Sequence, residues 1–343
     1  MVEPNIQLSV IVPTYNHGQQ LLQAVGSVFA ASLPTFEVIV VDDASTDHSI
    51  SQLAQAYALQ VITAQLKIYK RPHRGLNVAR NYGLKKAAGR YVMFVDATDY
   101  LLPDVDLMAD LLTATADILV YSQYLTPATG NKQRLLLSDL GLSTPVVFAA
   151  QPGSKCYRRQ FLIRHTFEFV SGLSRDADVV FNYQVLLAAQ HIQCLPRGIY
   201  ASRAQPVRYE RQSAPGQATL RLIRAMAPLL TASPRLWQRF VLYQYLELMK
   251  RLAQSSLNRR EVAHILARIK RQLVKLQPVA RPRIPLPGLL VPERWVLRRC
   301  WRFPKLSRWV WPLPMLVPYP HLTLPTNLPL EFSVATLDPK KHN

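Results

Sequence analysis

The chain has 343 residues, of which 49% are hydrophobic and 18% charged, a composition that predicts a globular protein of one large or two modest domains. Its net charge of +20 is unevenly spread: residues 1–150 hold 10 Lys and Arg against 12 Asp and Glu, whereas residues 151–343 hold 31 against 9. The three cysteines are widely spaced and form no CxxC pair, which argues against a disulfide framework and against a structural zinc site.

The start of the chain, MVEPNIQLSVIVP, lacks the basic first residues and the apolar core of a signal peptide. No run of about 20 apolar residues predicts a membrane-spanning helix. The cysteine usage fits a reducing compartment, so we expect a cytoplasmic protein.

In chain order, the first half alternates short apolar runs with helical patterns. Residues 8–12, 36–41 and 91–95 predict buried strands, and a less regular apolar stretch covers residues 59–68. A helix is expected from about residue 77 to residue 88. Strands and helices that alternate at this spacing predict an α/β fold with a parallel sheet and right-handed crossovers.

Polar residues follow these strands where each one ends. Thr14 follows the first, Asp42 and Asp43 follow the second, and Asp96 and Asp99 follow the third. Because ligands of open α/β sheets bind at the carboxyl ends of the strands, this edge predicts a site for a polar, phosphorylated ligand. Acidic residues repel phosphate, so such a site needs a bridging divalent cation and nearby arginines.

Three arginines are available as these cations: Arg71, Arg74 and Arg80. The common phosphate-binding loops GxGxxG and GxxxxGK[ST] are absent at the expected place, which argues against the usual dinucleotide and nucleoside-triphosphate folds. A simpler interpretation of Asp99 also stays open, namely that it caps the helix after Pro103.

Four sequence motifs, in the same order and at the same spacing, resemble those of one protein family. They are PTYN at 13–16, VVDDASTD at 40–47, GLNVARNYGLKKAAGRY at 75–91 and FVDATD at 94–99. They are similar to family 2 glycosyltransferases of the GT-A fold, of the type that builds bacterial cell-surface polysaccharides and exopolysaccharides. SKCYRRQFL at 154–162 and the segment from residue 175 to residue 192 continue the resemblance, which covers roughly residues 7–210. It implies a mostly parallel, Rossmann-like sheet flanked by helices.

The resemblance also implies where a nucleotide-sugar binds. Residues around Thr14 would line the nucleoside pocket, and Asp43 would accept a hydrogen bond from the base, typically from uracil N3–H. Asp42 is the structural member of that pair. The full set of expected nucleotide-sugar-binding residues is Pro13, Thr14, Tyr15, Asp43, Arg71, Arg80, Asp96 and Ala97. For Arg80, a buried structural ion pair is an equally open interpretation.

The implied cofactor is a divalent cation, Mn²⁺ or Mg²⁺, at Asp96, Thr98 and Asp99. The family pattern is Asp-x-Asp, and Thr98 stands where the second Asp is usual. Because a hydroxyl is a poorer magnesium ligand than a carboxylate, we expect weaker metal binding, or binding through Asp96 and the diphosphate.

The implied general base is Asp178, near the start of a helix that faces the acceptor. A carboxylate within hydrogen-bond reach of the acceptor hydroxyl, opposite the leaving diphosphate, suits a single inverting displacement. The family's preceding glutamate is replaced here by Ala177. This change and Thr98 keep open a second hypothesis, that the protein is a weak or inactive sugar-nucleotide-binding partner of another transferase.

The second half is basic. Residues 216–277 predict a helical extension in which Val262, Leu266 and Ile269 belong to one apolar stripe. That stripe either packs against the catalytic domain, which we favour, or lies on an anionic membrane. Residues 278–343 combine Pro, Trp and Arg, a composition that suits membrane headgroups, nucleic-acid stacking or a tail wrapped around the domain; the end from about residue 336 is expected to be disordered.

We therefore expect a GT-A domain over residues 1–215 followed by these two segments. The predicted reaction moves a sugar from a nucleotide-sugar, probably a UDP-sugar, to a hydroxyl of a cell-surface or exopolysaccharide glycan or its lipid-linked precursor, with inversion. The expected location is cytoplasmic and peripheral on the inner face of the plasma membrane. Nucleic-acid binding is a third hypothesis, motivated by charge alone.

Overall fold

The computed structural model describes residues 5–122, 152–173, 177–203, 216–230 and 259–276, with separate short stretches between residues 237 and 252. The Pro- and Trp-rich segment expected at 278–343, with its disordered end, lies outside these described residues. The boundaries expected for the three segments therefore stay predictions.

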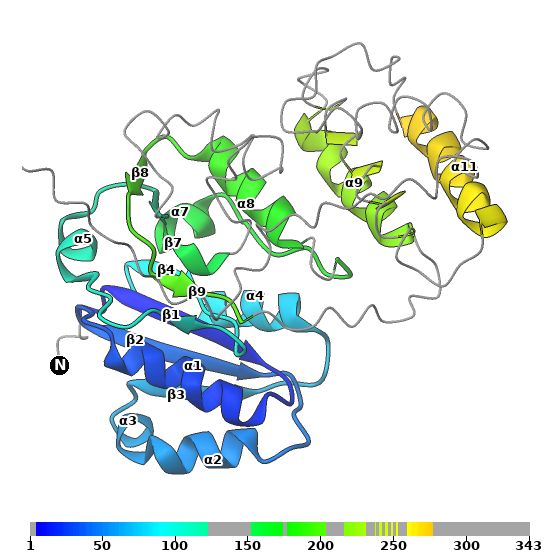
Figure 1. The fold of residues 1–343 in the computed structure, drawn as a ribbon. Coiled ribbons are helices and arrows are strands. Elements are labelled where there is room, and N and C mark those ends of the chain that lie inside the picture. Colours follow the sequence, from blue (N-terminus) through cyan, green and yellow to red (C-terminus); the bar gives the residue numbers. More distant parts are fainter. Residues whose placement is uncertain are drawn as a thin grey trace, which may run out of the picture.

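A seven-stranded sheet forms the centre, in the order β3-β2-β1-β4-β7-β6-β8 (Figure 1). The strands are β1 (Leu8–Thr14), β2 (Phe36–Asp42), β3 (Leu66–Lys70), β4 (Tyr91–Phe94), β6 (Ile118–Tyr121), β7 (Lys155–Arg158) and β8 (Ile192–Leu195). Neighbours run parallel except β7, which is antiparallel to both β4 and β6. The predicted, mostly parallel α/β sheet is thus confirmed. The expected apolar stretch at 59–68 divides into a short helix and β3.

Helices cover both faces of the sheet because the strands are buried on both sides. The helices are α1 (Gly18–Ala30), α2 (Ser49–Ala56), α3 (Ala58–Ile62), α4 (Leu76–Lys86), α5 (Met108–Thr113), α7 (Arg159–Arg164) and α8 (Ala177–Ala188). Val10 and Val12 of β1 point into the core shared with α1 and α2, whereas Ile11 points into the core shared with α4, α7 and α8. This alternation places β1 at the centre of a three-layer structure.

The strand order reverses beside β1, which lies between β2 and β4. At such a reversal the connecting helices leave toward opposite faces, so a crevice opens at the carboxyl ends of the strands. A small second sheet, formed by β5 (Tyr100–Leu101) and β9 (Tyr200–Ala201), lies next to this edge. The fold therefore places the polar residues that follow β1, β2 and β4 in one region.

The basic extension contains two described helices, α9 (Gln217–Leu230) and α11 (Arg259–Leu276); α9 lies beside α8, and α11 lies beside α9 (Figure 1). The apolar stripe of α11 is buried, and Val262, Leu266 and Ile269 are each at most 1% exposed. They share one apolar core with α9 and with Ala177 and Val180 of α8. The packing interpretation of this stripe is therefore correct, and the stripe does not face a membrane.

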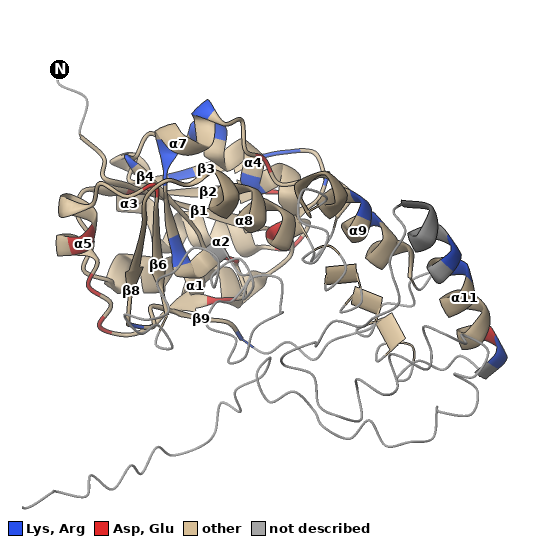
Figure 2. Ribbon diagram, turned by 90° about the horizontal axis from the view of Figure 1, so that it is seen from above, with Lys and Arg blue, Asp and Glu red and all other residues tan. Residues whose placement is uncertain are grey.

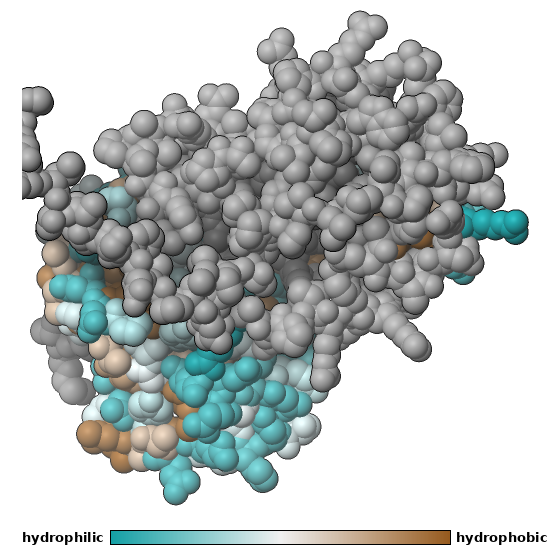
Figure 3. All heavy atoms as spheres, viewed as in Figure 1, coloured by the Kyte–Doolittle hydropathy of each residue, from teal (hydrophilic) through white to brown (hydrophobic). Residues whose placement is uncertain are grey.

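Two surface features lie on different helices. Exposed arginines mark α9 and α11, among them Arg221, Arg268 and Arg271 (Figure 2). Exposed apolar side chains occur on α3, where Leu59 is 67% and Ile62 81% exposed, beside the hydrophilic surface of α2 (Figure 3). Among the described residues, no helix combines the length and the apolar character needed to cross a membrane.

Helix α4 lies close to the sheet at a glycine. A Cβ atom built on Gly83 would lie 2.4 Å from Cγ2 of Ile11 and 3.3 Å from Cγ2 of Val41, both in buried strands. A Cβ atom on Gly26 of α1 would meet the hydroxyl of Tyr57 at 2.8 Å, the end of a side chain that can move. The two helical glycines therefore differ in how much space they leave.

We expect Gly83→Ala to destabilise the protein although alanine is the better helix former. Overpacking a buried contact costs about 1–3 kcal/mol, which exceeds the gain of up to about 1 kcal/mol from helix propensity. Gly26→Ala is the matched control and should be neutral or stabilising. Urea unfolding followed by circular dichroism measures both changes, and equal stability of the two variants would show that α4 has room at Gly83.

Candidate active site

The polar residues at the carboxyl edge of the sheet meet, as expected, at the ends of β1, β2 and β4. Thr14 ends β1 and is 1% exposed, and Asp42 ends β2. Asp42 accepts a hydrogen bond from the Ser45 backbone N–H at 2.9 Å, in agreement with its expected structural role. Asp96 follows β4 and, unlike the buried Asp42, Asp43 and Asp99, has 32% of its side chain accessible.

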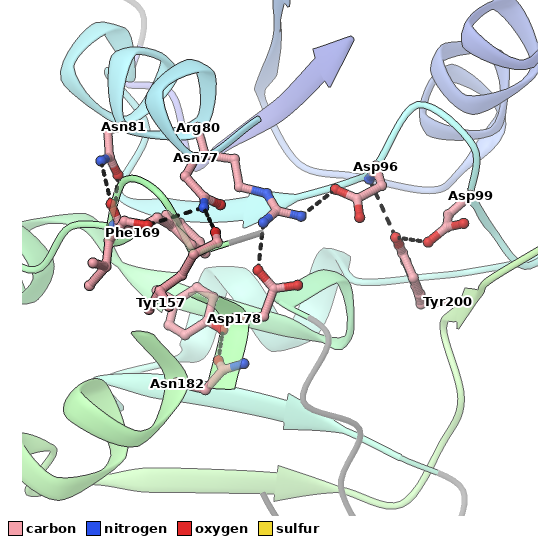
Figure 4. A network of polar contacts seen from close by, with 12 residues as sticks. Asn77, Arg80, Asn81, Asp96, Asp99, Tyr157, Phe169, Asp178, Asn182 and Tyr200 are labelled. Carbon is pink, nitrogen blue, oxygen red and sulfur yellow. Dashed lines mark hydrogen bonds and ion pairs between the residues drawn. The ribbon is translucent and has the colours of Figure 1, made fainter. Parts of the chain in front are cut away.

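A buried arginine joins two of the predicted acids (Figure 4). Arg80 of α4 donates from Nη2 to Oδ1 of Asp96 at 2.6 Å and from Nη1 to Oδ1 of Asp178 at 2.5 Å. Its side chain is 1% exposed, and its guanidinium lies 5.0 Å from the ring centroid of Phe169. Of the two open interpretations of Arg80, these contacts support the buried ion pair. They also bring together residues that lie 98 positions apart in the chain.

The environment shifts the proton affinity of this group of charges. Burial raises the pKa of Asp178 to about 6 and the negative charge of Asp96 adds to this increase, while Arg80 opposes it. Burial alone would lower the pKa of Arg80, but the two carboxylates outweigh it and raise that pKa above its usual value. Arg80 therefore stays positively charged, and Asp178 has the proton affinity of a base that works near neutral pH.

Ala177, which stands where the family usually has glutamate, is fully buried. It lies in the apolar core that α8 shares with Ile223 and Met226 of α9. A glutamate side chain there would place a carboxylate among apolar groups, which is costly without a partner. The alanine therefore fits the way in which the helical extension packs on the helix that carries Asp178.

Asp99 is tied to the small second sheet. Its carboxylate is buried and accepts a hydrogen bond from the hydroxyl of Tyr200 at 2.6 Å (Figure 4). It also accepts from the hydroxyls of Thr98 at 3.0 Å and Ser202 at 3.2 Å. The Tyr200 hydroxyl in turn accepts the backbone N–H of Asp96 at 3.3 Å. Burial raises the pKa of Asp99 despite these donors. Asp99 thus connects the acidic loop to β9.

These contacts decide which predicted residues suit a metal ion. The hydroxyl of Thr98 is directed at Asp99, and Asp99 already accepts several hydrogen bonds, so their geometry argues against the expected role of both as ligands. Within the described part of the chain, no three His, Cys, Asp or Glu side chains form a group that could hold a metal. Asp96 alone offers an accessible carboxylate, which fits a cation held by one carboxylate and the oxygens of a diphosphate.

Asp43, the predicted reader of the base, holds the loop that precedes α4. Its Oδ1 accepts the backbone N–H of Arg74 at 2.8 Å and its Oδ2 that of Gly75 at 2.8 Å. The Nδ1 atom of His73 lies 2.9 Å from the same Oδ2. Tyr15 is 41% exposed next to this group, with its ring centroid 4.3 Å from that of His73.

Three other residues predicted to bind the nucleotide-sugar, namely Arg71, Pro13 and Ala97, have side chains that pack against the protein. Arg71 has its guanidinium 4.5 Å from the ring centroid of Tyr82 on α4. Pro13 and Ala97 are buried, so their side chains belong to the core, and their backbone is what remains for a ligand. The binding roles of these residues stay predictions.

Two side chains of the site were not anticipated from the sequence. His73 carries no motif of its own, and Tyr200 lies 101 residues from the Asp99 carboxylate that it contacts. A carboxylate such as Asp99 needs donors when it is buried, but this requirement does not say which residue supplies them.

Parts of this chain are similar to known glycosyltransferases. Residues 9–172 match the model of "Glycosyl transferase family 2". The chain is 27% identical over 222 residues to the uncharacterized glycosyltransferase YibD of Escherichia coli, covering 58% of this chain and 62% of YibD. It is 29% identical over 205 residues to the poly(ribitol-phosphate) β-N-acetylglucosaminyltransferase TarS of Staphylococcus aureus, covering 57% of this chain and 35% of TarS. The matched part is thus less than two thirds of either relative.

The fold is also that of a solved relative. The crystal structure of residues 1–349 of S. aureus TarS superimposes with a TM-score of 0.61 at 19% identity, covering 88% of this chain and 89% of that one. The sheet, the acidic strand ends and the matched motifs therefore lead to the same conclusion. Residues 9–172 of this chain belong to glycosyl transferase family 2, on a GT-A fold.

Proposed function

We propose that the protein is an inverting glycosyltransferase that moves a sugar from a UDP-sugar to a hydroxyl of a cell-surface or exopolysaccharide glycan, or of its lipid-linked precursor. The observation that carries this proposal is that the buried side chain of Arg80 forms ion pairs with both Asp96 and Asp178. Asp96 is the acid expected beside the sugar donor, and Asp178 is the candidate base. The relatives support the substrate classes. TarS is named for transfer to poly(ribitol-phosphate), and a structure of TarS residues 1–349 contains UDP-GlcNAc.

In the proposed reaction Asp178 takes the proton of the acceptor hydroxyl as its oxygen forms a bond to the anomeric carbon. The bond from that carbon to the diphosphate breaks at the same time, and UDP leaves with the electron pair, so the configuration inverts. Arg80 donates to Oδ1 of Asp178, and the proposal assigns Oδ2 to the acceptor hydroxyl. Arg80 is buried and acts as a positioning residue. Asp96 would hold the divalent cation, which neutralises charge on the leaving diphosphate when it is bound.

We place the protein at the inner face of the plasma membrane. The exposed arginines of α9 and α11 support contact with an anionic surface, because basic side chains near such a surface are attracted to it. The apolar stripe of α11 makes no contribution, since it is buried.

We expect Asp178→Asn to lower transfer by about 10²- to 10⁴-fold, the usual contribution of a general base, and to leave UDP affinity within about twofold. Glu168→Gln is the matched control, because Glu168 is 52% exposed in an ion pair with Lys85 and should be dispensable. Donor turnover and calorimetric UDP binding measure the two effects. Full turnover by Asp178→Asn would remove this residue from the mechanism.

The same base predicts the acid side of the pH profile. A carboxyl whose pKa is raised to about 6 becomes protonated as the pH falls below that value, and a protonated Asp178 cannot accept the hydroxyl proton. We expect kcat/KM to be constant above about pH 7 and to fall tenfold per pH unit below about pH 5.5. Initial rates at acceptor concentrations well below KM test this, and a rate unchanged down to pH 4.5 would contradict it.

We expect UDP binding to need Mn²⁺ and to weaken by at least tenfold in Asp96→Asn. This variant keeps an oxygen that accepts from Arg80 but loses the charge that would hold the cation. Calorimetry with and without Mn²⁺ on both proteins measures the effect. Tight binding that ignores Mn²⁺ and the substitution, without donor turnover, would instead favour the non-catalytic sugar-nucleotide-binding protein suggested by Thr98.

A further inference from the structure

His73 contacts both Tyr15, an expected nucleotide-sugar-binding residue, and Asp43, the expected contact of the nucleobase. Its ring centroid is 4.3 Å from that of Tyr15, with 39° between the ring planes. Its Nδ1 lies 2.9 Å from Oδ2 of Asp43 and 3.0 Å from the backbone oxygen of the same residue, so an Nδ1–H would be shared between them. The imidazole thus covers an aromatic face and donates to a carboxylate.

A uracil base would make the same two contacts. It is a planar ring that would stack on the exposed Tyr15, and its N3–H would donate to the carboxylate of Asp43. We propose that the His73 side chain occupies the nucleobase site of the free protein and must rotate away before the base of the donor binds. This inference rests on the proposed function, which supplies the nucleotide.

The rings of Tyr15 and His73 are too close for a nucleobase to fit between them. Aromatic pairs keep their centroids roughly 4.5–7 Å apart, so the 4.3 Å between Tyr15 and His73 cannot admit a third ring between them. The base would therefore displace the imidazole from Tyr15 rather than slide in beside it.

Rotation of one side chain is enough for this exchange. The backbone N–H groups of Arg74 and Gly75 bind the two oxygens of Asp43 and hold the loop in place, independently of the His73 ring. The His73 side chain is 58% exposed, so it faces solvent into which it can turn. Gly75 has φ +93°, a conformation that favours glycine, and ends the loop where α4 begins.

The consequence is a lower apparent affinity for the nucleotide. If the nucleotide binds only molecules in which His73 has rotated away, its apparent affinity is reduced by the fraction of molecules in which His73 occupies the site. Removal of the His73 side chain abolishes this reduction. The effect should depend on the base, because a ligand without a base does not compete with His73.

The test compares UDP binding to the wild type and to His73→Ala by calorimetry in the presence of Mn²⁺. We expect His73→Ala to bind UDP about three- to tenfold more tightly, as the loss of one stacking contact and one hydrogen bond would allow. His48→Ala is the control, because His48 is an exposed histidine on a neighbouring loop whose backbone oxygen accepts from Gln52, and it should leave the affinity unchanged.

Two further measurements separate competition from a change of charge. Inorganic pyrophosphate, which has no base, should bind wild type and His73→Ala equally. In a Tyr15→Ala background the gain from His73→Ala should shrink, because one of the contested contacts is gone.

The outcomes are distinct. Equal or weaker UDP binding by His73→Ala, or an equal gain for pyrophosphate, would overturn this inference and leave the proposed function standing. Absence of UDP binding in the wild type and in every variant would overturn both.

Discussion

The buried guanidinium of Arg80 is the contact on which the site depends. A cation with 1% exposure is stable only if carboxylates surround it, and here they come from two separate parts of the chain, Asp96 after β4 and Asp178 on α8. Loss of one carboxylate would leave Arg80 paired with the other, whereas loss of both would leave its buried charge uncompensated. The requirement to neutralise Arg80 therefore sets the separation of the donor-side acid and the candidate base, and it ties α4, β4 and α8 into one unit.

The remaining acids of the edge act as structural ties as well. Asp43 binds the backbone of the loop before α4, and Asp99 binds Tyr200 of the small second sheet and Ser202 just after it. Each is buried and has its oxygens satisfied by neighbouring donors, as buried carboxylates require. Asp96, in contrast, has 32% of its side chain accessible, so it is better placed than Asp43 and Asp99 to meet a ligand.

The helical extension takes part in the architecture of the site. The apolar core shared by α8, α9 and α11 contains Ala177, the neighbour of Asp178. Packing on this side orients the helix that carries the candidate base, while the charged sides of α9 and α11 face solvent. The same two helices thus supply an apolar support toward the domain and a basic surface away from it.

The sequence by itself determined the sheet, the family motifs and the positions of Asp43, Asp96 and Asp178, because apolar runs, turn residues and local spacing are properties of short segments. Only the tertiary structure decided what those side chains do. The sequence was equally compatible with a ligand contact and with a buried ion pair for Arg80, and the structure shows its 2.5 Å contact with Asp178 of α8. For Asp99 the sequence predicted a metal ligand, and the structure adds its hydrogen bond from Tyr200. His73 had no signal at all. Contacts between residues some 30 to 100 positions apart depend on how the whole chain folds, and short sequence patterns do not predict them.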